Sequence, residues 1–218
     1  MTGPIKAVVS DFGGVLTAPL MSFFARFQSD AGVPLEALGK AMARIASEQG
    51  FQPLYELEKG KLSEQRFIEL LDEAVSVELG REVHLHGLAD AYWRDLATND
   101  EMVAYLRDLH ARGFRLALLT NNVREWEARW RPMVPVDELF EDVVDSAFVG
   151  ARKPEPRIFE IVLERLGGVD PATCVLLDDF ESNCEGARAL GMHAVRFTST
   201  EQAIADLEAL LDGRGGDG

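Results

Sequence analysis

Short apolar runs alternate with amphipathic stretches along most of the chain, and this alternation indicates the fold class. Five runs predict buried strands, at 5–12, 114–120, 143–149, 173–177 and 193–197. In the stretches that adjoin the later runs, apolar residues recur at three- and four-residue spacing, which predicts helices at 98–112, 154–166, 182–190 and 200–211. Strands that alternate with helices favour an α/β fold with a doubly wound parallel sheet.

One long stretch interrupts the alternation directly after the first strand. Residues 19–97 have helical spacing throughout and contain no good strand pattern. The sequence Ser63-Glu64-Gln65-Arg66 is typical of a capped helix start and predicts a helix at 64–79. We therefore expect an α/β core made of 1–18 and 98–212, an inserted helical cap at 19–97, and a flexible tail at 213–218.

Composition and charge exclude several classes of partner. The chain has 218 residues, of which 47% are hydrophobic and 27% charged, as in ordinary globular proteins. A net charge of −15 repels nucleic acid and anionic lipid, so neither is expected as a partner. No window has the apolar length of a membrane span, and the first residues lack a secretory pattern, so a cytoplasmic location is expected. The oligomeric state stays open.

Polar residues follow three of the predicted strands directly. Asp11 ends the first strand, Thr120 and Asn121 the second, and the pair Asp178-Asp179 the fourth. Ligands of open parallel sheets bind at the carboxyl ends of the strands, so these side chains are expected to converge. Carboxylates that lie close together repel one another unless a proton or a cation intervenes, and an oxygen-rich site of this kind suits Mg²⁺.

A lysine adds a positive charge to this set. Lys153 lies in the segment GARKPEP, where Pro154 is expected to open the next helix and to fix the turn. Any single Asp after a strand is often only a cap or a turn residue, and a lone lysine before a helix is usually a surface residue. The combination instead indicates a site in which Lys153 balances the carboxylates and binds a phosphate oxygen.

These residues, in this order, resemble the haloacid dehalogenase-like hydrolase superfamily over nearly the whole chain. The segments GARKPEPRIF and LLDDFESNCEGARALGMHAV are most similar to one branch of it. That branch contains the N-terminal phosphatase domain of soluble epoxide hydrolases and bacterial sugar-phosphate phosphatases.

The resemblance implies a Mg²⁺-dependent phosphatase that acts on a small phosphorylated metabolite. Asp11 would be the nucleophile that becomes an aspartyl phosphate. Mg²⁺ would bind Asp11, the backbone carbonyl of Gly13 and Asp179, with Asp178 beside it. The Thr120 hydroxyl, the Asn121 backbone amide and Lys153 would bind the transferring oxygens. Asn183 would orient Lys153.

One position departs from the family pattern. The family usually has a second Asp two residues after the nucleophile, as general acid and base, and here that position is Gly13. Such catalysis contributes roughly 10²–10⁴-fold, so we expect a bias toward good leaving groups such as aryl or anomeric sugar phosphates. A non-catalytic metal- or phosphate-binding regulator is the alternative. A dehalogenase is less favoured because those enzymes lack the acidic pair.

Substrate selection is expected to lie in the cap. Phe23, Phe24 and Arg26 follow the nucleophile loop closely and are predicted to face the substrate. The other aromatic residues of the cap are expected to form its core. His84 and His86 have no matching ligands near them in the sequence, so no metal site is expected there.

Overall fold

Five parallel strands form the centre of the molecule. The computed structural model describes residues 4–19, 28, 32–94 and 96–212. The sheet has the order β3-β2-β1-β4-β5 and consists of β1 (Ala7–Ser10), β2 (Arg115–Thr120), β3 (Asp142–Asp145), β4 (Cys174–Asp178) and β5 (His193–Arg196). Each neighbouring pair is parallel, so the predicted α/β class is confirmed.

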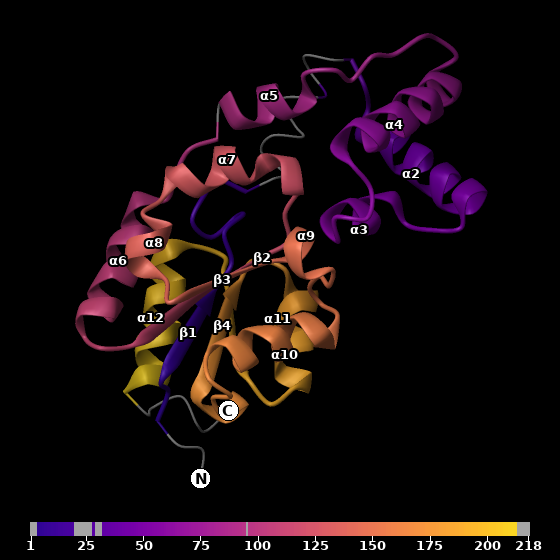
Figure 1. Cartoon of the computed structure of the whole chain (residues 1–218). Helices are drawn as coiled ribbons and strands as arrows, with labels where there is room; N and C mark the ends of the chain where they lie inside the picture. The colour runs from indigo at the N-terminus through magenta and orange to yellow at the C-terminus, as the bar shows by residue number, and fades with distance from the viewer. Residues whose placement is uncertain (1–3, 20–27, 29–31, 95, 213–218) are drawn as a thin grey trace.

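Helices cover both faces of this sheet (Figure 1). One face carries α6 (Asp100–Ala111) and α12 (Thr200–Leu211), and the other carries α10 (Pro156–Arg165) and α11 (Glu181–Ala189). Val8 packs into the first apolar cluster, whereas Ala7 and Val9 pack into the second. Because successive strand residues point to opposite faces, a strand buried on both sides needs a continuous apolar run.

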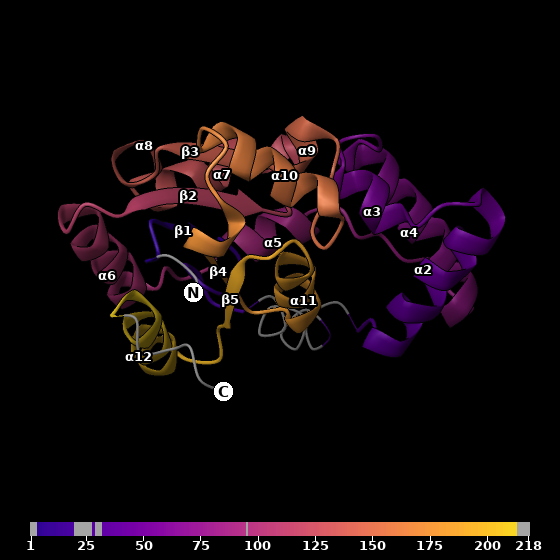
Figure 2. The ribbon, with the colours of Figure 1, turned by 90° about the horizontal axis from the view of Figure 1, so that it is seen from below.

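Four further helices lie between β1 and α6 in the sequence. They are α2 (Leu35–Gln49), α3 (Pro53–Glu58), α4 (Glu64–Leu79) and α5 (Leu88–Arg94). In Figures 1 and 2, α2, α3 and α4 lie together beside the sheet. We call α2–α5 the cap helices. The predicted start of α4 is confirmed, since the Ser63 hydroxyl accepts a hydrogen bond from the Arg66 amide (3.2 Å).

The chain leaves the sheet and returns to it at one place. Thr17 and Thr98 form an antiparallel bridge, and the Ala18 amide donates to the Ala97 carbonyl (2.9 Å). The two ends of the cap segment therefore lie side by side, and the first of them is only a few residues after Asp11 in the chain. The predicted cap and core boundaries stay a prediction, because residues 20–27 and 29–31 are outside the described part of the chain.

Two short elements differ from the sequence-based expectation. The strand predicted at 143–149 ends at Asp145, and α9 (Ser146–Val149) follows it. The Asp145 carboxylate accepts from the Ala147 amide (2.9 Å), which starts a helical turn where the apolar pattern favoured more strand. Pro154 does not open a helix, because α10 begins at Pro156.

The remaining elements are short and lie between β2 and β4. They are the helices α7 (Glu127–Trp130) and α8 (Val136–Leu139) and the 3₁₀ turns Arg124–Trp126, Arg131–Met133 and Pro171–Thr173. Trp130 is fully buried, and its ring lies 5.3 Å from that of Phe12. Within the described ranges, no helix has both the length and the apolar character needed to cross a bilayer.

Candidate active site

Asp11 lies at the carboxyl end of β1. Its backbone amide donates to the Leu177 carbonyl (2.9 Å), which extends the β1–β4 pairing by one residue and fixes the position of the side chain. The Asp11 Oδ1 atom accepts a hydrogen bond from the Phe12 amide (2.7 Å). The carboxylate is largely buried, yet it lines a cavity.

Lys153 connects two of the carboxylates. Its Nζ atom lies 2.8 Å from Asp11 Oδ1 and 2.6 Å from Asp178 Oδ2, and the side chain is fully buried. Burial alone would lower the pKa of Lys153, but the charges of Asp11 and Asp178 raise it above its ordinary value. Lys153 is therefore a permanent cation at the end of β1.

The backbone of Lys153 is fixed by Asn121. The Lys153 amide donates to Asn121 Oδ1 (2.8 Å), and Asn121 Nδ2 donates to the Lys153 carbonyl (3.0 Å). Both bonds join the end of β2 to the loop before α10. The side chain of Asn121 is therefore engaged in positioning Lys153, and only its backbone amide is available to a ligand.

Asp178 is bonded through both of its oxygens. Oδ1 accepts from Asn183 Nδ2 (2.8 Å) and from the Phe180 amide (2.9 Å), while Oδ2 lies against Lys153. The structure thus places Asn183 on Asp178 rather than on Lys153. Any orienting effect of Asn183 on Lys153 is transmitted by the Asp178 carboxylate.

Asp179 has the least satisfied carboxylate of the three. Its Oδ1 atom is buried, and no other described residue donates a hydrogen bond to it. Oxygens of Asp11, Asp178 and Asp179 all lie within 4.8 Å of one another. Burial raises the pKa of Asp179 to about 6, and it raises that of Asp11 to about 8 against the lowering effect of Lys153.

One lysine does not offset three clustered carboxylates, so the site favours an additional cation. A buried carboxylate oxygen without a donor is the expected position of a hard metal ion such as Mg²⁺. Gly13 lines the same cavity as Asp11 and Asp179. The residues present therefore fit the metal that the sequence predicted.

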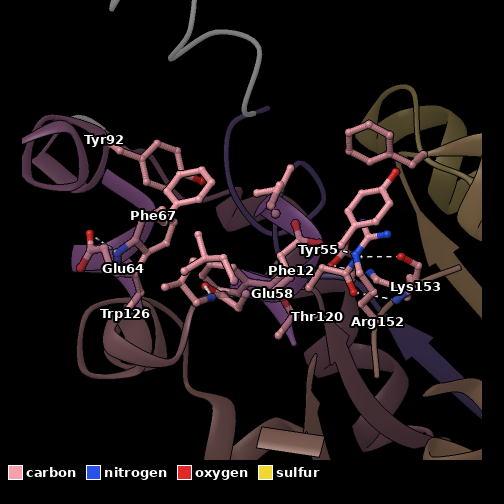
Figure 3. A pocket seen from close by; sticks show the side chains of 18 of the residues that line it. Phe12, Tyr55, Glu58, Glu64, Phe67, Tyr92, Thr120, Trp126, Arg152 and Lys153 are labelled. Atoms are coloured by element: carbon pink, nitrogen blue, oxygen red, sulfur yellow. Dashed lines mark hydrogen bonds and ion pairs between the residues drawn. The ribbon is translucent and has the colours of Figure 1, made fainter. Parts of the chain in front are cut away.

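A cavity of 620 Å³ lies above these residues (Figure 3). Asp11, Thr120, Lys153, Asp179 and Asn183 belong to its wall, and Thr120 is almost fully buried at the end of β2. Figure 3 shows Tyr55, Arg152 and Lys153 at one end of the cavity and Phe67, Tyr92 and Trp126 at the other. The cap helices and the ends of the strands therefore enclose one common space.

Polar contacts join the cap helices to the core around the cavity. Arg152 Nε lies 2.5 Å from Glu58 Oε2 at the end of α3, and the Arg152 guanidinium lies 4.0 Å from the ring centre of Tyr55. Burial raises the pKa of Glu58, while Arg152 opposes this shift. On the other side, Trp126 Nε1 donates to Glu64 Oε1 (2.9 Å).

The structure brings together most of the residues that the sequence singled out. At the carboxyl ends of the strands it places Asp11, Thr120, Lys153 and the Asp178-Asp179 pair close together, with Gly13, Asn121 and Asn183 beside them. Phe23, Phe24 and Arg26 lie outside the described residues, so the prediction that they face the substrate stays untested.

Sequence reasoning missed Glu58 and Arg152, which line the cavity and form an ion pair although they are 94 residues apart in the sequence. The only available signal was that Arg152 directly precedes Lys153.

Sequence reasoning also missed Asp72, which lies close to His84 and His86 and makes a possible ligand group with them. That group is largely exposed, and none of its members lines the cavity.

Comparison with known proteins identifies the family. The chain matches the haloacid dehalogenase-like hydrolase model over residues 5–191. It is 30% identical to phosphatase MT3486 of Mycobacterium tuberculosis (strain CDC 1551 / Oshkosh), over 97% of this chain and 99% of that protein. It is also 30% identical to acyl-CoA dehydrogenase family member 10 of Mus musculus, over 94% of this chain but only 19% of that much longer protein.

Solved structures share the fold. A HAD family enzyme from Bacteroides thetaiotaomicron, in complex with magnesium and inorganic phosphate, has a TM-score of 0.64 at 23% identity. The match covers 90% of this chain and 96% of that one. Together with the family match over most of the sequence, these findings show that the chain belongs to the haloacid dehalogenase-like family of hydrolases.

Proposed function

We propose that the protein is a Mg²⁺-dependent phosphatase that hydrolyses phosphate monoesters through a phosphorylated Asp11. The observation that carries this proposal is the contact of 2.8 Å between Lys153 Nζ and Asp11 Oδ1 at the floor of a cavity, with Asp179 beside it. The similarity to a mycobacterial phosphatase supports it, as does a related fold crystallised with magnesium and inorganic phosphate.

The metal would bind Asp11, Asp179 and the Gly13 carbonyl. Asp178 would contribute negative charge rather than a ligand atom, because both of its oxygens already accept hydrogen bonds. When bound, Mg²⁺ supplies positive charge that shields Asp11 from the incoming phosphate and stabilises the transferring group.

The chain's own residues carry out two displacements. An Asp11 oxygen attacks phosphorus, and the bond from phosphorus to the ester oxygen breaks, so that this oxygen leaves with the electron pair and takes a proton from solvent. Water then attacks phosphorus and breaks its bond to Asp11, which releases inorganic phosphate, returns a proton to solvent and restores the carboxylate. Lys153, the Thr120 hydroxyl and the Asn121 amide bind the phosphoryl oxygens in both steps.

A non-catalytic phosphate-binding protein on the same fold is the second candidate, and Gly13 is the observation that favours it. Without a carboxyl group at this position, the departing alcohol receives no proton from the residue that supplies it in relatives. The two candidates differ in turnover, whereas both bind Mg²⁺ and phosphate.

The decisive experiment measures phosphate release from phenyl phosphate with Mg²⁺ and with a chelator. We expect turnover that requires the metal, and loss of turnover in Asp11→Asn. Asp108→Asn, on the exposed side of α6, is the control for removal of a carboxylate elsewhere and keeps full activity. Unchanged turnover in Asp11→Asn contradicts the mechanism. Phosphate binding without turnover of any ester supports the second candidate.

A further inference from the structure

We propose that the natural substrate is the phosphate ester of an apolar alcohol, aryl or alkyl, whose apolar part fills the cavity above Asp11. This inference rests on the proposed phosphatase function and specifies its substrate class. It separates this chain from phosphatases of sugar phosphates and of phosphorylated amino acids.

Apolar side chains from all four cap helices line the cavity. The cavity wall includes Leu38 and Met42 of α2, Leu57 of α3, Ile68 and Leu71 of α4, and Trp93 of α5. They meet at the cavity although α2 and α4 are separated by 14 residues and α5 lies further on. A ligand group between them is removed from water on several sides, which is favourable only for an apolar group.

The charged residues of the wall are already paired. Arg152 lies against Glu58, Lys153 against Asp11 and Asp178, and Glu64 accepts from Trp126. Among the described lining residues, Asp179 is the charged group whose buried carboxylate oxygen accepts no hydrogen bond, and it belongs to the candidate metal site. A carboxylate or ammonium group on the alcohol would therefore be buried without a partner of opposite charge.

Three amide side chains of the wall are equally restricted. Asn121 bonds the Lys153 backbone, Asn183 bonds Asp178, and the Asn122 side chain accepts from the Val123 amide (2.9 Å). All three lie on the core side, close to the phosphate end. Sugar hydroxyl groups that lie against the apolar side chains of α2 and α4 would stay unpaired, which weakens binding.

Gly13 favours the aryl members of this class. Because this position donates no proton, an alcohol that leaves readily without one is favoured, and phenols do so better than sugar hydroxyls other than the anomeric one. An aryl phosphate therefore satisfies both the leaving-group requirement and the apolar wall.

The experiment compares kcat/KM for butyl, hexyl and octyl phosphate with that for glycerol phosphate and glucose 1-phosphate. Burial of each methylene predicts an increase of about fourfold in kcat/KM. We expect this rise along the alkyl series and weak activity on both polyols. A flat series, or a preference for a polyol, overturns the inference while leaving the phosphatase function intact.

Two variants on one helix locate the effect. Ile68→Asn places an amide in the cavity wall and is expected to reduce the rise of kcat/KM from butyl to octyl phosphate. Val77→Asn, on the exposed face of α4, is expected to leave the dependence as it was. Equal effects of the two variants contradict a binding role for this wall.

A binding measurement separates the two proposals. In Asp11→Asn, which should not turn over, octyl phosphate is expected to bind at least tenfold more tightly than inorganic phosphate. If no ester is hydrolysed by the native protein but this preference is found, the phosphatase function fails and the apolar ligand class stands. If the two ligands bind equally, the apolar ligand class is wrong.

Discussion

The backbone of Gly14 passes directly beneath the carboxylate of Asp179. A Cβ atom on Gly14 would lie 2.3 Å from Asp179 Oδ2 and 2.7 Å from its Cγ. The φ angle of Gly14 is 77°, which side chains disfavour as well. The close approach of the two segments therefore requires a glycine, and it keeps Asp179 next to Asp11.

Gly14→Ala is expected to displace Asp179 and to weaken Mg²⁺ binding by about 10–100-fold, the usual effect of disturbing the surroundings of a metal ligand. Gly113→Ala is the matched control, since Gly113 also has a positive φ but a Cβ there meets nothing within 4 Å. Metal titration followed by calorimetry measures the difference. Similar Mg²⁺ affinity in the two variants would show that Asp179 does not bind the ion.

Gly13 offers space for the missing acid. A Cβ atom at this position meets nothing within 4 Å, and its φ is not in the left-handed region. In Gly13→Asp we expect kcat for alkyl phosphates, which leave poorly, to rise by roughly 10²–10⁴-fold, with little change for p-nitrophenyl phosphate. The reason is that only the poor leaving group needs a proton.

Gly13→Asn is the control for shape, because its side chain has the same size without an acidic proton. Comparison of the two leaving groups in both variants isolates proton transfer. An equal gain in Gly13→Asn would attribute the effect to packing. No gain in Gly13→Asp, with good native turnover, would show that another group already supplies the proton.

Gly60 controls how closely α3 approaches the core. Its φ is 66°, and a Cβ there would lie 2.2 Å from the Ala147 carbonyl oxygen. Gly60→Ala is expected to push the cap helices outward and to raise KM by roughly tenfold or more, because the cavity wall moves away from the substrate. Steady-state kinetics test this, together with acrylamide quenching of tryptophan fluorescence.

Gly80 provides the comparison for this change. It has a similar φ of 62° at the end of α4, but a Cβ there meets nothing within 4 Å. Gly80→Ala therefore carries the backbone strain without the clash, and its KM should match that of the native protein. A raised KM in both variants would assign the effect to loss of stability instead.

The position of the site at the carboxyl ends of the strands could be predicted from the sequence because the residues that determine it are local. An apolar run followed by Asp11 or by Asp178 specifies a strand end, and parallel strands place such ends together whatever the rest of the chain does. The same holds for α4, whose start depends on Ser63 and the three residues after it. Local capping also explains the error at β3, where Asp145 begins a turn of helix within an apolar run.

The cavity could not be predicted in the same way. Its wall depends on how α2 and α4 approach the core, and a helical pattern gives the apolar face of a helix without giving its partner. The pairing of Glu58 with Arg152 joins positions 94 residues apart, and no spacing in the sequence indicates it. The apolar wall on which the proposed substrate class depends could therefore be recognised only in the structure.

Asp145 predicts a pH dependence of stability away from the active site. It is buried, one oxygen accepts from the Ala147 amide, and the other has no hydrogen bond from any described residue. Burial raises the pKa of Asp145 from 3.8 to about 7. Between these two values the native state binds more protons than the unfolded chain, so the free energy of unfolding falls as pH rises, and it levels off above pH 7.

Asp145→Asn removes this titration and retains an oxygen that can cap α9. We expect the native protein to lose about 1 kcal/mol per pH unit relative to the variant between pH 5 and pH 7. Urea unfolding at intervals of one pH unit measures it. Asp170→Asn is the control, because Asp170 caps the turn Pro171–Thr173 through the same kind of bond (3.0 Å to the Ala172 amide) but is exposed. If the stability difference between the native protein and Asp145→Asn is the same at every pH, Asp145 is ionised in the native state throughout, and the missing donor at its second oxygen is supplied by water.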